Sequence, residues 1–299
     1  MSNISVVINT LNEEKNLPRV LSSIKGFADE IVVVDMKSDD NTQAIAKSAG
    51  AEVYLHEPTG YVEPARNFAI AKAKSEWVLI LDADEEIGPE LKSALKKIVG
   101  NPLGDYYALP RKNIIFNKWM KHSRWWPDYN IRFFKKGSVS WSEVIHSVPM
   151  TVGTGMDLEA LEENAIVHYH YSSLEQYITR LNRYTTQHSK VLSNDGYNFK
   201  WQHLIQKPVS EFLSRYFQGE GYKDGVHGLA LSSLQAFSEL VLYLKLWEID
   251  KFKPSEVGLK NVLNEIKESE KSLNYWQADT LIKNGGGVGQ RIKRKFKLP

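Results

Sequence analysis

The 299-residue sequence contains no cysteine. Structural disulfides, thiolate nucleophiles and cysteine-based zinc sites are therefore excluded, and a reducing compartment is favoured. It also lacks an uncharged apolar run of 18 residues, because Glu239 and Lys245 interrupt the longest candidate, Leu229–Trp247. We therefore expect no membrane-spanning helix. Residues Met1–Thr10 lack the cationic start and the apolar stretch of a secretory signal, which favours a cytoplasmic protein.

An excess of one charge sign is also missing, since 38 Lys and Arg face 36 Asp and Glu for a net charge of +2. Nothing in this balance calls for a nucleic-acid partner. Two glycine-rich phosphate-binding motifs are absent: there is no P-loop, and Asn9–Glu14 stands where a GxGxxG turn would follow the first strand. The run Gly285–Gly289 is predicted to be a flexible linker. Neither a Rossmann dehydrogenase nor a P-loop NTPase is supported.

What the first half does contain is an alternation of short, β-branched apolar runs with helical patterns. This alternation is typical of βαβ units, and it predicts an α/β fold with a mostly parallel sheet covered on both faces. The predicted strands are Ile4–Ile8, Ile31–Val34, Glu52–Leu55 and Trp77–Leu81, and the predicted helices are Asn16–Ile24, Thr42–Ala49, Pro64–Lys72 and Pro89–Ile98.

The pattern changes twice further along the chain. Short aromatic-rich strands are predicted first, at Tyr106–Leu109, Asn130–Phe134, Val139–Trp141 and Ala165–His170. Long amphipathic helices are predicted next, at Ser173–Leu192, Pro208–Phe217, Gly228–Trp247 and Pro254–Ser269. We therefore predict a nucleotide-binding domain over residues 1–171, a helical region over 172–284 and a glycine-rich basic tail over 285–299.

Carboxylates follow two of the predicted parallel strands. Asp35 ends the second strand, and Asp82, Asp84, Glu85 and Glu86 follow the fourth. Ligands of doubly wound sheets bind beyond the carboxyl ends of the strands. Four carboxylates within five residues repel one another unless a cation or a basic group compensates them, and Mg²⁺ or Mn²⁺ suits such ligands. Because alternate residues of an extended segment point the same way, we predict that Asp82 and Asp84 face one ligand.

Three blocks of this sequence resemble the inverting family 2 glycosyltransferases of the GT-A fold: Val6–Glu14, Val33–Thr42 and Trp77–Glu85. The second block is similar to the family's Val-Asp-Asp-Gly-Ser-x-Asp-x-Thr motif, and the third to its Leu-Asp-x-Asp motif. The resemblance implies a GT-A fold followed by a helical region, and transfer of a sugar from a nucleotide sugar, UDP being the expected nucleotide. Met36 replaces the family's second aspartate, so position 36 receives no role in binding the base.

The resemblance also implies roles for single residues. Asp35 would bind the nucleotide base, Asp82 the ribose or the metal, and Asp84 the metal that the diphosphate holds. Thr10 would lie against the uridine, and Arg66 near the base or the diphosphate. The donor-binding positions implied in this way are Thr10, Asn12, Glu13, Asp35, Arg66 and Asp82.

A narrower likeness, to bacterial lipopolysaccharide core β-1,4-glucosyltransferases, rests on Trp126–Phe134, Ile166–Tyr169, Tyr216–Phe217 and Gly225–Leu229. It implies a glycan or glycolipid acceptor in the synthesis of cell-surface polysaccharide. This subgroup has a Val-His-Glu triplet where the chain reads Ile145-His146-Ser147, so the glutamate expected as the base is missing.

Inverting sugar transfer needs a base to accept the proton of the acceptor hydroxyl and a cation to stabilise the leaving diphosphate. Glu143 and Asp128 are both candidates for the base. A divalent cation, Mg²⁺ or Mn²⁺, would be held by Asp84 with help from Asp82. Family likeness places two histidines, His146 and His168, near the same site.

The basic segment Arg291–Lys297 closes the chain and is predicted either to contact anionic lipid or to remain a solvated tail. We favour peripheral membrane contact. Two alternatives to a transferase remain. A non-catalytic glycan-binding or membrane-binding protein that kept the fold is left open by Ser147. A nucleotidyltransferase is disfavoured, because the acidic Asn12–Glu14 replaces its glycine-rich basic loop.

Overall fold

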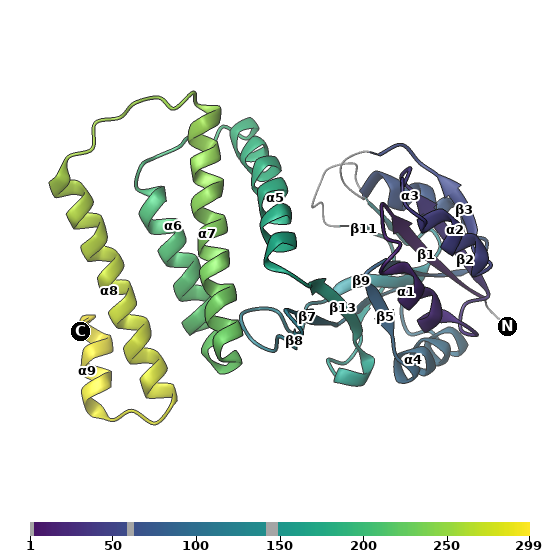
Figure 1. Ribbon diagram of the computed structural model, residues 1–299. Coiled ribbons are helices and arrows are strands. Elements are labelled where there is room, and N and C mark those ends of the chain that lie inside the picture. Colours follow the sequence, from purple (N-terminus) through teal and green to yellow (C-terminus); the bar gives the residue numbers. More distant parts are fainter. Residues whose placement is uncertain (1–2, 59–62, 142–148) are drawn as a thin grey trace. The chain divides into compact units, whose positions relative to one another are not determined.

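The computed structural model describes residues 3–58, 63–141 and 149–299 (Figure 1). The chain divides into two compact units. The first comprises Met1–Ile114 and Trp126–His170, and the second comprises Ile115–Trp125 and Tyr171–Pro299. Residues 115–125 therefore belong to the second unit although the first unit flanks them in sequence, and we call this segment the excursion. All residues from Tyr171 onward belong to the second unit.

A seven-stranded sheet of order β12-β6-β9-β4-β1-β2-β3 forms the frame of the first unit. Strands β4, β1, β2 and β3 are parallel, and β9 runs antiparallel between β4 and β6. The four predicted N-terminal strands and the α/β fold are confirmed, with strand ends shifted by at most two residues. The bounds are β1 Ile4–Thr10, β2 Glu30–Asp35, β3 Glu52–Leu55, β4 Trp77–Asp82, β6 Tyr106–Leu109, β9 Asn130–Lys135 and β12 Gly155–Asp157.

Alternate residues of the central strands supply two cores, one on each face of the sheet, because successive side chains of a strand point to opposite faces. Val6 and Ile8 of β1 pack with α1, α2 and α4, whereas Val7 packs with α3. Each fully buried aliphatic side chain contributes roughly 1.5–3 kcal/mol, so both helix layers are held firmly. The helices are α1 Leu17–Ile24, α2 Thr42–Ser48, α3 Glu63–Lys72 and α4 Pro89–Gly100.

A smaller sheet of order β5-β13-β7-β8 adjoins the carboxyl end of β4 in sequence. The acidic stretch Glu85–Ile87, for which the sequence pattern predicts no strand, forms β5 because β13 pairs with it and places His168 opposite Glu85. The remaining bounds are β7 Arg111–Ile115, β8 Lys118–Trp119, β10 Val139–Ser140, β11 Met150–Thr151 and β13 Ile166–Tyr171.

The second unit is helical, as predicted, but two helix starts differ from the prediction. The helix predicted from Pro208 begins at His203, so Pro208 lies inside it, and a π-turn over Ser214–Gln218 follows. The helix predicted over Pro254–Ser269 begins at Leu259 and runs to Lys283. The helices are α5 Leu174–Asn194, α6 His203–Leu213, α7 Val226–Ile249, α8 Leu259–Lys283 and α9 Val288–Phe296.

The glycine-rich segment is shorter than the predicted linker, because α9 begins at Val288 within it. The turn is fixed on α8: the Gly286 N–H donates to the Leu281 carbonyl at 2.8 Å, and Arg294 of α9 pairs with Asp279 of α8 at 2.8 Å. The prediction of a flexible linker over residues 285–289 is therefore wrong for its second half.

The excursion Ile115–Trp125 helps to fill the core of the second unit. Ile115 and Met120 are buried together with Tyr177 of α5 and Leu231 of α7. At the start of α7 the backbone approaches another segment closely: a Cβ on Gly228 would lie 1.8 Å from the Gly221 carbonyl oxygen. A glycine is therefore required at position 228.

Among the described residues, α7 is the one helix whose length and composition would suit a membrane crossing, and 28% of its most apolar window is buried. A core helix can meet the same two criteria. In the second unit α7 packs against α5 and α6. The expectation that the chain does not span a membrane stays a prediction.

Candidate functional site

The carboxyl ends of β1, β2 and β4 meet at one edge of the sheet, as the sequence pattern predicts. In the strand register Thr10 lies opposite Asp35, and Asn9 lies opposite Asp82. Three predicted donor-binding residues, Thr10, Asp35 and Asp82, are thus brought together by parallel pairing alone. In doubly wound sheets this edge is where ligands bind.

Asp35 is fully buried at this edge and is held by neutral donors. Its Oδ2 accepts hydrogen bonds from the Thr10 hydroxyl at 3.0 Å and the Ser38 hydroxyl at 2.5 Å. Its Oδ1 accepts from the Ser38 N–H and from Nε2 of Gln43, both at 2.9 Å. A carboxylate has about four acceptor positions, so those of Asp35 are occupied by Thr10 of β1, Ser38 of the loop after β2 and Gln43 of α2. Asp35 therefore organises that loop.

The turn after β1 is tied to the same loop through its backbone. Asn12 has a left-handed φ of 57°, its N–H donates to Ser38 Oγ at 2.8 Å, and its Oδ1 accepts from the Asp39 N–H at 3.0 Å. The Glu13 N–H donates to Thr42 Oγ1 at 2.8 Å. Asn12 and Glu13 thus shape one rim of the strand-end site.

Asp82, in contrast, is held by positive charge. Its Oδ1 pairs with Arg66 of α3 at 2.9 Å, and its Oδ2 pairs with Arg132 of β9 at 2.5 Å. Burial raises the pKa of Asp82, but the charges of Arg132 and Arg66 and the hydrogen bond from Arg132 hold this pKa well below its usual range. Asp82 is therefore ionised, and both of its oxygens already bind arginine.

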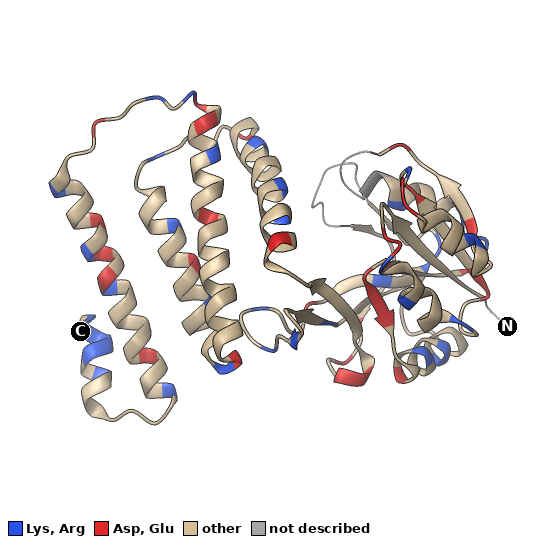
Figure 2. Ribbon diagram, viewed as in Figure 1, with Lys and Arg blue, Asp and Glu red and all other residues tan. Residues whose placement is uncertain are grey.

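Arg132 of β9 is a charged residue buried in the site, since it is only 2% exposed. Its Nη2 also contacts Oε1 of Glu85 at 3.1 Å, and Nη1 of Arg111 lies 3.4 Å from the same oxygen. Glu85 of the acidic strand β5, which is red in Figure 2, is thus compensated from inside the protein by two arginines, Arg132 and Arg111. The sequence pattern predicts that a cation or a basic group is needed, and the structure supplies basic groups.

Asp84 and His168 form the other half of the site. Asp84 lies in the turn between β4 and β5 rather than on an extended segment, so the predicted Asp82–Asp84 alternation does not hold there. His168 Nε2 faces Asp84 Oδ1 at 3.6 Å, and both residues are buried. His168 and His170 share one face of β13, and their rings stack with centroids 4.5 Å apart.

The orientation of the His168 ring is set from behind by Asn113 of β7. Nδ2 of Asn113 donates to Asp128 Oδ2 at 3.0 Å, so its Oδ1 is the atom 2.7 Å from His168 Nδ1. Nδ1 therefore carries a hydrogen, and Nε2 is the ring nitrogen that faces Asp84. This arrangement is typical of a metal-binding histidine and its supporting residue.

Asp128, a candidate base, is bound closely by its neighbours. Its Oδ2 accepts from Nε and Nη2 of Arg111 at 3.0 and 2.7 Å in addition to the bond from Asn113. About 30% of its side chain is exposed. Asp128 thus links Arg111 to the Asn113–His168 pair. Glu143 and His146, the other predicted residues, lie outside the described residues.

Three residues of this network are not among the predicted site residues: Arg111, Asn113 and Arg132. One signal was present for Arg132, since it is a charged residue inside the apolar run Ile131–Phe134. Among the described residues, no group of three or more histidines and carboxylates is placed to hold a metal by itself.

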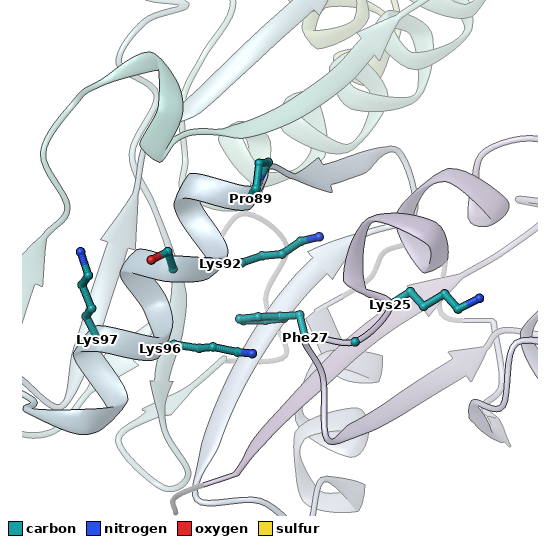
Figure 3. A pocket seen from close by; sticks show the side chains of 8 residues that line it. Lys25, Phe27, Pro89, Lys92, Lys96 and Lys97 are labelled. Atoms are coloured by element: carbon teal, nitrogen blue, oxygen red, sulfur yellow. The ribbon is translucent and has the colours of Figure 1, made fainter.

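A hollow of about 490 Å³ lies elsewhere on the first unit, between the end of α1 and α4 (Figure 3). Lys25, Lys92, Lys96 and Lys97 line it together with Phe27 and Pro89. Its lining residues differ from those of the strand-end site, so the two are separate features.

Comparison with known proteins places this site in a family. The model of the family described as "Glycosyl transferase family 2" matches residues 5–163, just over half of the chain. An uncharacterized glycosyltransferase of Rickettsia typhi is 31% identical over 273 residues, covering 88% of this chain and 93% of its own. One of Rickettsia conorii is 30% identical over 269 residues, covering 87% and 93%.

Among solved structures, glucosyl-3-phosphoglycerate synthase from Mycobacterium tuberculosis, in complex with Mn²⁺, UDP and glucosyl-3-phosphoglycerate, matches at 25% identity with a TM-score of 0.31. The match covers 38% of this chain and 43% of that enzyme, which is less than half of its length.

Proposed function

The chain belongs to glycosyl transferase family 2, and from this premise we propose that it transfers a sugar, with inversion, from a UDP-sugar to a glycan or glycolipid acceptor. The observation that carries this proposal is the convergence of Thr10, Asp35 and Asp82 at one edge of a parallel sheet, beside the Asp84–His168 pair. The fold itself, an α/β sheet flanked by helices with a helical region after it, is the one that the family resemblance implied.

In the donor site that we propose, the ends of β1 and β2 hold the nucleoside, and the arginines beside Asp82 hold the diphosphate. Asp35 fixes the loop after β2, which leaves Thr10 and the Asn12–Glu13 turn to line the base and the ribose. Arg66 pairs with Asp82, and its Cζ lies 5.7 Å from the ring centre of Trp141; we propose that its guanidinium group also contacts the diphosphate. Its Nε and the Nη1 of Arg132 are buried without a hydrogen-bond partner among the described residues. Unsatisfied buried donors of this kind suit an anionic ligand.

A divalent cation fits one half of the carboxylate cluster and not the other. Asp82 is bound by two arginines and is a poor ligand, whereas Oδ1 of Asp84 and Nε2 of His168 face each other at 3.6 Å. Two protein ligands completed by substrate phosphates are a common way to hold Mg²⁺ or Mn²⁺. We propose Asp84 and His168 as these ligands, with the diphosphate supplying the rest. When bound, the ion would stabilise charge on the leaving diphosphate.

The proton of the acceptor hydroxyl needs a base, and we keep Glu143 and Asp128 as the two candidates. The three hydrogen bonds at Asp128 Oδ2 favour a positioning role for this residue, since they hold Arg111 and Asn113 in place. Replacement of each separates the two: loss of the base stops transfer but leaves donor binding intact, whereas loss of Asp128 as a positioning residue also weakens cation binding.

The acceptor that we propose is a glycan of bacterial surface polysaccharide or lipopolysaccharide, met at the inner, cytoplasmic face of the cell membrane. Its support is the motif likeness in Trp126–Phe134 and Ile166–Tyr169 to lipopolysaccharide core β-1,4-glucosyltransferases. Lipid-linked acceptors require an enzyme that works at that surface.

The deciding experiment is calorimetric titration of UDP, with Mn²⁺ and with chelator, on the parent protein, Asp84→Asn and the control Asp250→Asn, which alters an exposed residue. We expect binding that needs Mn²⁺ in the parent and the control, and its loss in Asp84→Asn. Absence of UDP binding in the parent under every condition would overturn the proposal of a UDP-sugar donor. Binding of UDP without hydrolysis or transfer of any UDP-sugar would favour the non-catalytic alternative.

A further inference from the structure

Helix α9 is amphipathic in the opposite sense to a helix that packs on its own protein. Val288, Ile292 and Phe296 follow one another at four-residue spacing and share one face, and they are 70%, 51% and 61% exposed. The half-buried residues of α9 are the polar Gln290 and Arg294 on the other side. A surface helix of a soluble domain normally turns its apolar stripe inward, and this one turns it to solvent.

The way in which α9 is fixed on α8 explains this orientation. Arg294 donates to Asp279 of α8 at 2.8 Å, and Asn274 of α8 contacts the Lys297 carbonyl at 3.4 Å. Both contacts use the polar side of α9 or its end, so the helix is anchored by that side. The apolar face is thereby held outward.

Positive charge borders the outward apolar face. Residues 284–299 contain five basic residues and no acidic one, and α9 is marked in blue in Figure 2. Arg294 is engaged with Asp279, whereas Arg291, Lys293 and Lys295 form no ion pair with the residues that the structure describes. On a helical wheel Arg291 and Lys295 flank the apolar face on one side, and Lys293 flanks it on the other.

We propose that α9 lies in the surface of a membrane rich in anionic lipid, with Val288, Ile292 and Phe296 inserted between headgroups and the flanking cations on the phosphates. An apolar stripe edged by Lys and Arg is the composition of interfacial helices. Anionic headgroups match the charge of the helix, and attraction of each cation to such a surface amounts to roughly a fivefold change in affinity. This inference deepens the proposed function, because it gives the enzyme a route to a lipid-linked acceptor.

The experiment is co-sedimentation of the full chain with vesicles of phosphatidylcholine and phosphatidylglycerol at 3:1, and with vesicles of phosphatidylcholine alone. Two double variants test the helix, Ile292→Gln/Phe296→Gln and Lys293→Gln/Lys295→Gln. Their matched controls remove exposed residues of the first unit, Leu55→Gln/Leu103→Gln and Lys47→Gln/Lys97→Gln. Far-UV circular dichroism checks that each variant is folded.

We expect the parent and both controls to sediment with anionic vesicles and to be released by high salt, and each α9 variant to bind at least tenfold more weakly. Equal recovery of the parent in the supernatant with both vesicle types would overturn the proposal, as would unchanged binding by the α9 variants. A dimer in analytical ultracentrifugation that Ile292→Gln/Phe296→Gln dissociates, without vesicle binding, would assign the face to a second copy of the chain and also overturn it. Titration of UDP on the same variants keeps this result separate from the donor site, since none of the residues proposed for that site belongs to α9.

Discussion

Asp35 and Asp82 occupy equivalent places at the ends of two parallel strands, β2 and β4, yet they are stabilised by different means. Asp35 is fully buried and accepts four hydrogen bonds from neutral groups of three segments: Thr10 of β1, Ser38 of the following loop and Gln43 of α2. Asp82 receives two arginines from distant parts of the chain, Arg66 and Arg132. The first anion is stabilised by dipoles and the second by charge.

This difference indicates which side of the site is more sensitive to substitution. The neutral donors Thr10, Ser38 and Gln43 hold Asp35 without a buried positive charge that would itself need compensation. A cluster of buried charges depends on every member, because removal of one leaves the others uncompensated. We call Asp35 with its hydrogen-bond partners the β2 rim, and Asp82 and Glu85 with their arginines the β4 rim. We expect substitutions in the β2 rim to destabilise the protein less than substitutions in the β4 rim.

The largest effect is expected from Arg132→Met, which leaves Asp82 and Glu85 without their shared buried cation. The free energy of unfolding should fall by about 3–5 kcal/mol, measured by urea denaturation. Arg124→Met is the control, because Arg124 is half exposed and pairs with Glu211 at 3.1 Å; it should cost no more than about 1 kcal/mol. Equal losses for the two variants would contradict the charge-based account of the β4 rim.

Asp35→Asn tests the other rim and should cost about 1–3 kcal/mol, because the new amide nitrogen faces donors where an acceptor stood. The same urea denaturation measures it. Asp39→Asn, at an exposed position of the same loop, should change the free energy of unfolding little. A loss larger than that of Arg132→Met would reverse the comparison.

At His168 a neutral group and a carboxylate act together, since the amide of Asn113 orients the ring toward Asp84. Asn113→Leu keeps the shape but removes the acceptor of Nδ1–H, so Mn²⁺ affinity should fall by about 10–100-fold in calorimetric titration. Nitrogen NMR of the His168 ring should show a changed tautomer. Asn198→Leu, at an exposed position of the second unit, is the control. Unchanged Mn²⁺ affinity and an unchanged tautomer would refute the positioning role of Asn113.

The smallest effect concerns acid. Because the pKa of Asp82 in the folded protein lies well below its ordinary value of 3.8, this group stabilises the fold above that value and the contribution is lost as pH falls toward the lowered pKa. The difference in stability between the parent and Asp82→Asn should therefore shrink below about pH 4. Thermal unfolding from pH 3 to 7 measures it, and a difference that stayed constant with pH would count against an ionised, arginine-bound Asp82.

The sequence allowed the parallel half of the sheet and its carboxylates to be predicted, because both signals are local. Apolar runs mark β1, β2 and β4, and the polar residue after each run marks the edge where ligands bind. These local signals were sufficient to predict that Thr10, Asp35 and Asp82 lie close together.

The arginines could not be predicted, because their places depend on pairings between distant segments. Arg132 reaches Asp82 only because β9 inserts antiparallel between β4 and β6, and Arg111 reaches Glu85 through a second sheet. Neither pairing has a periodicity of its own in the sequence. Helix α9 is a similar case: its basic residues are visible in the sequence, but which face of the helix turns outward is decided by the pairing of Arg294 with Asp279.

The excursion Ile115–Trp125 has a consequence for how the protein is made. Met120 is buried beneath α7, and the Ser123 N–H donates to the Gly219 carbonyl at 2.7 Å, so this segment emerges from the ribosome about a hundred residues before its partners exist. The helical unit also cannot be cut out as one continuous piece. A fragment starting at Tyr171 lacks a part of its own interior, and a stable version of that half must carry residues 115–125 grafted onto it.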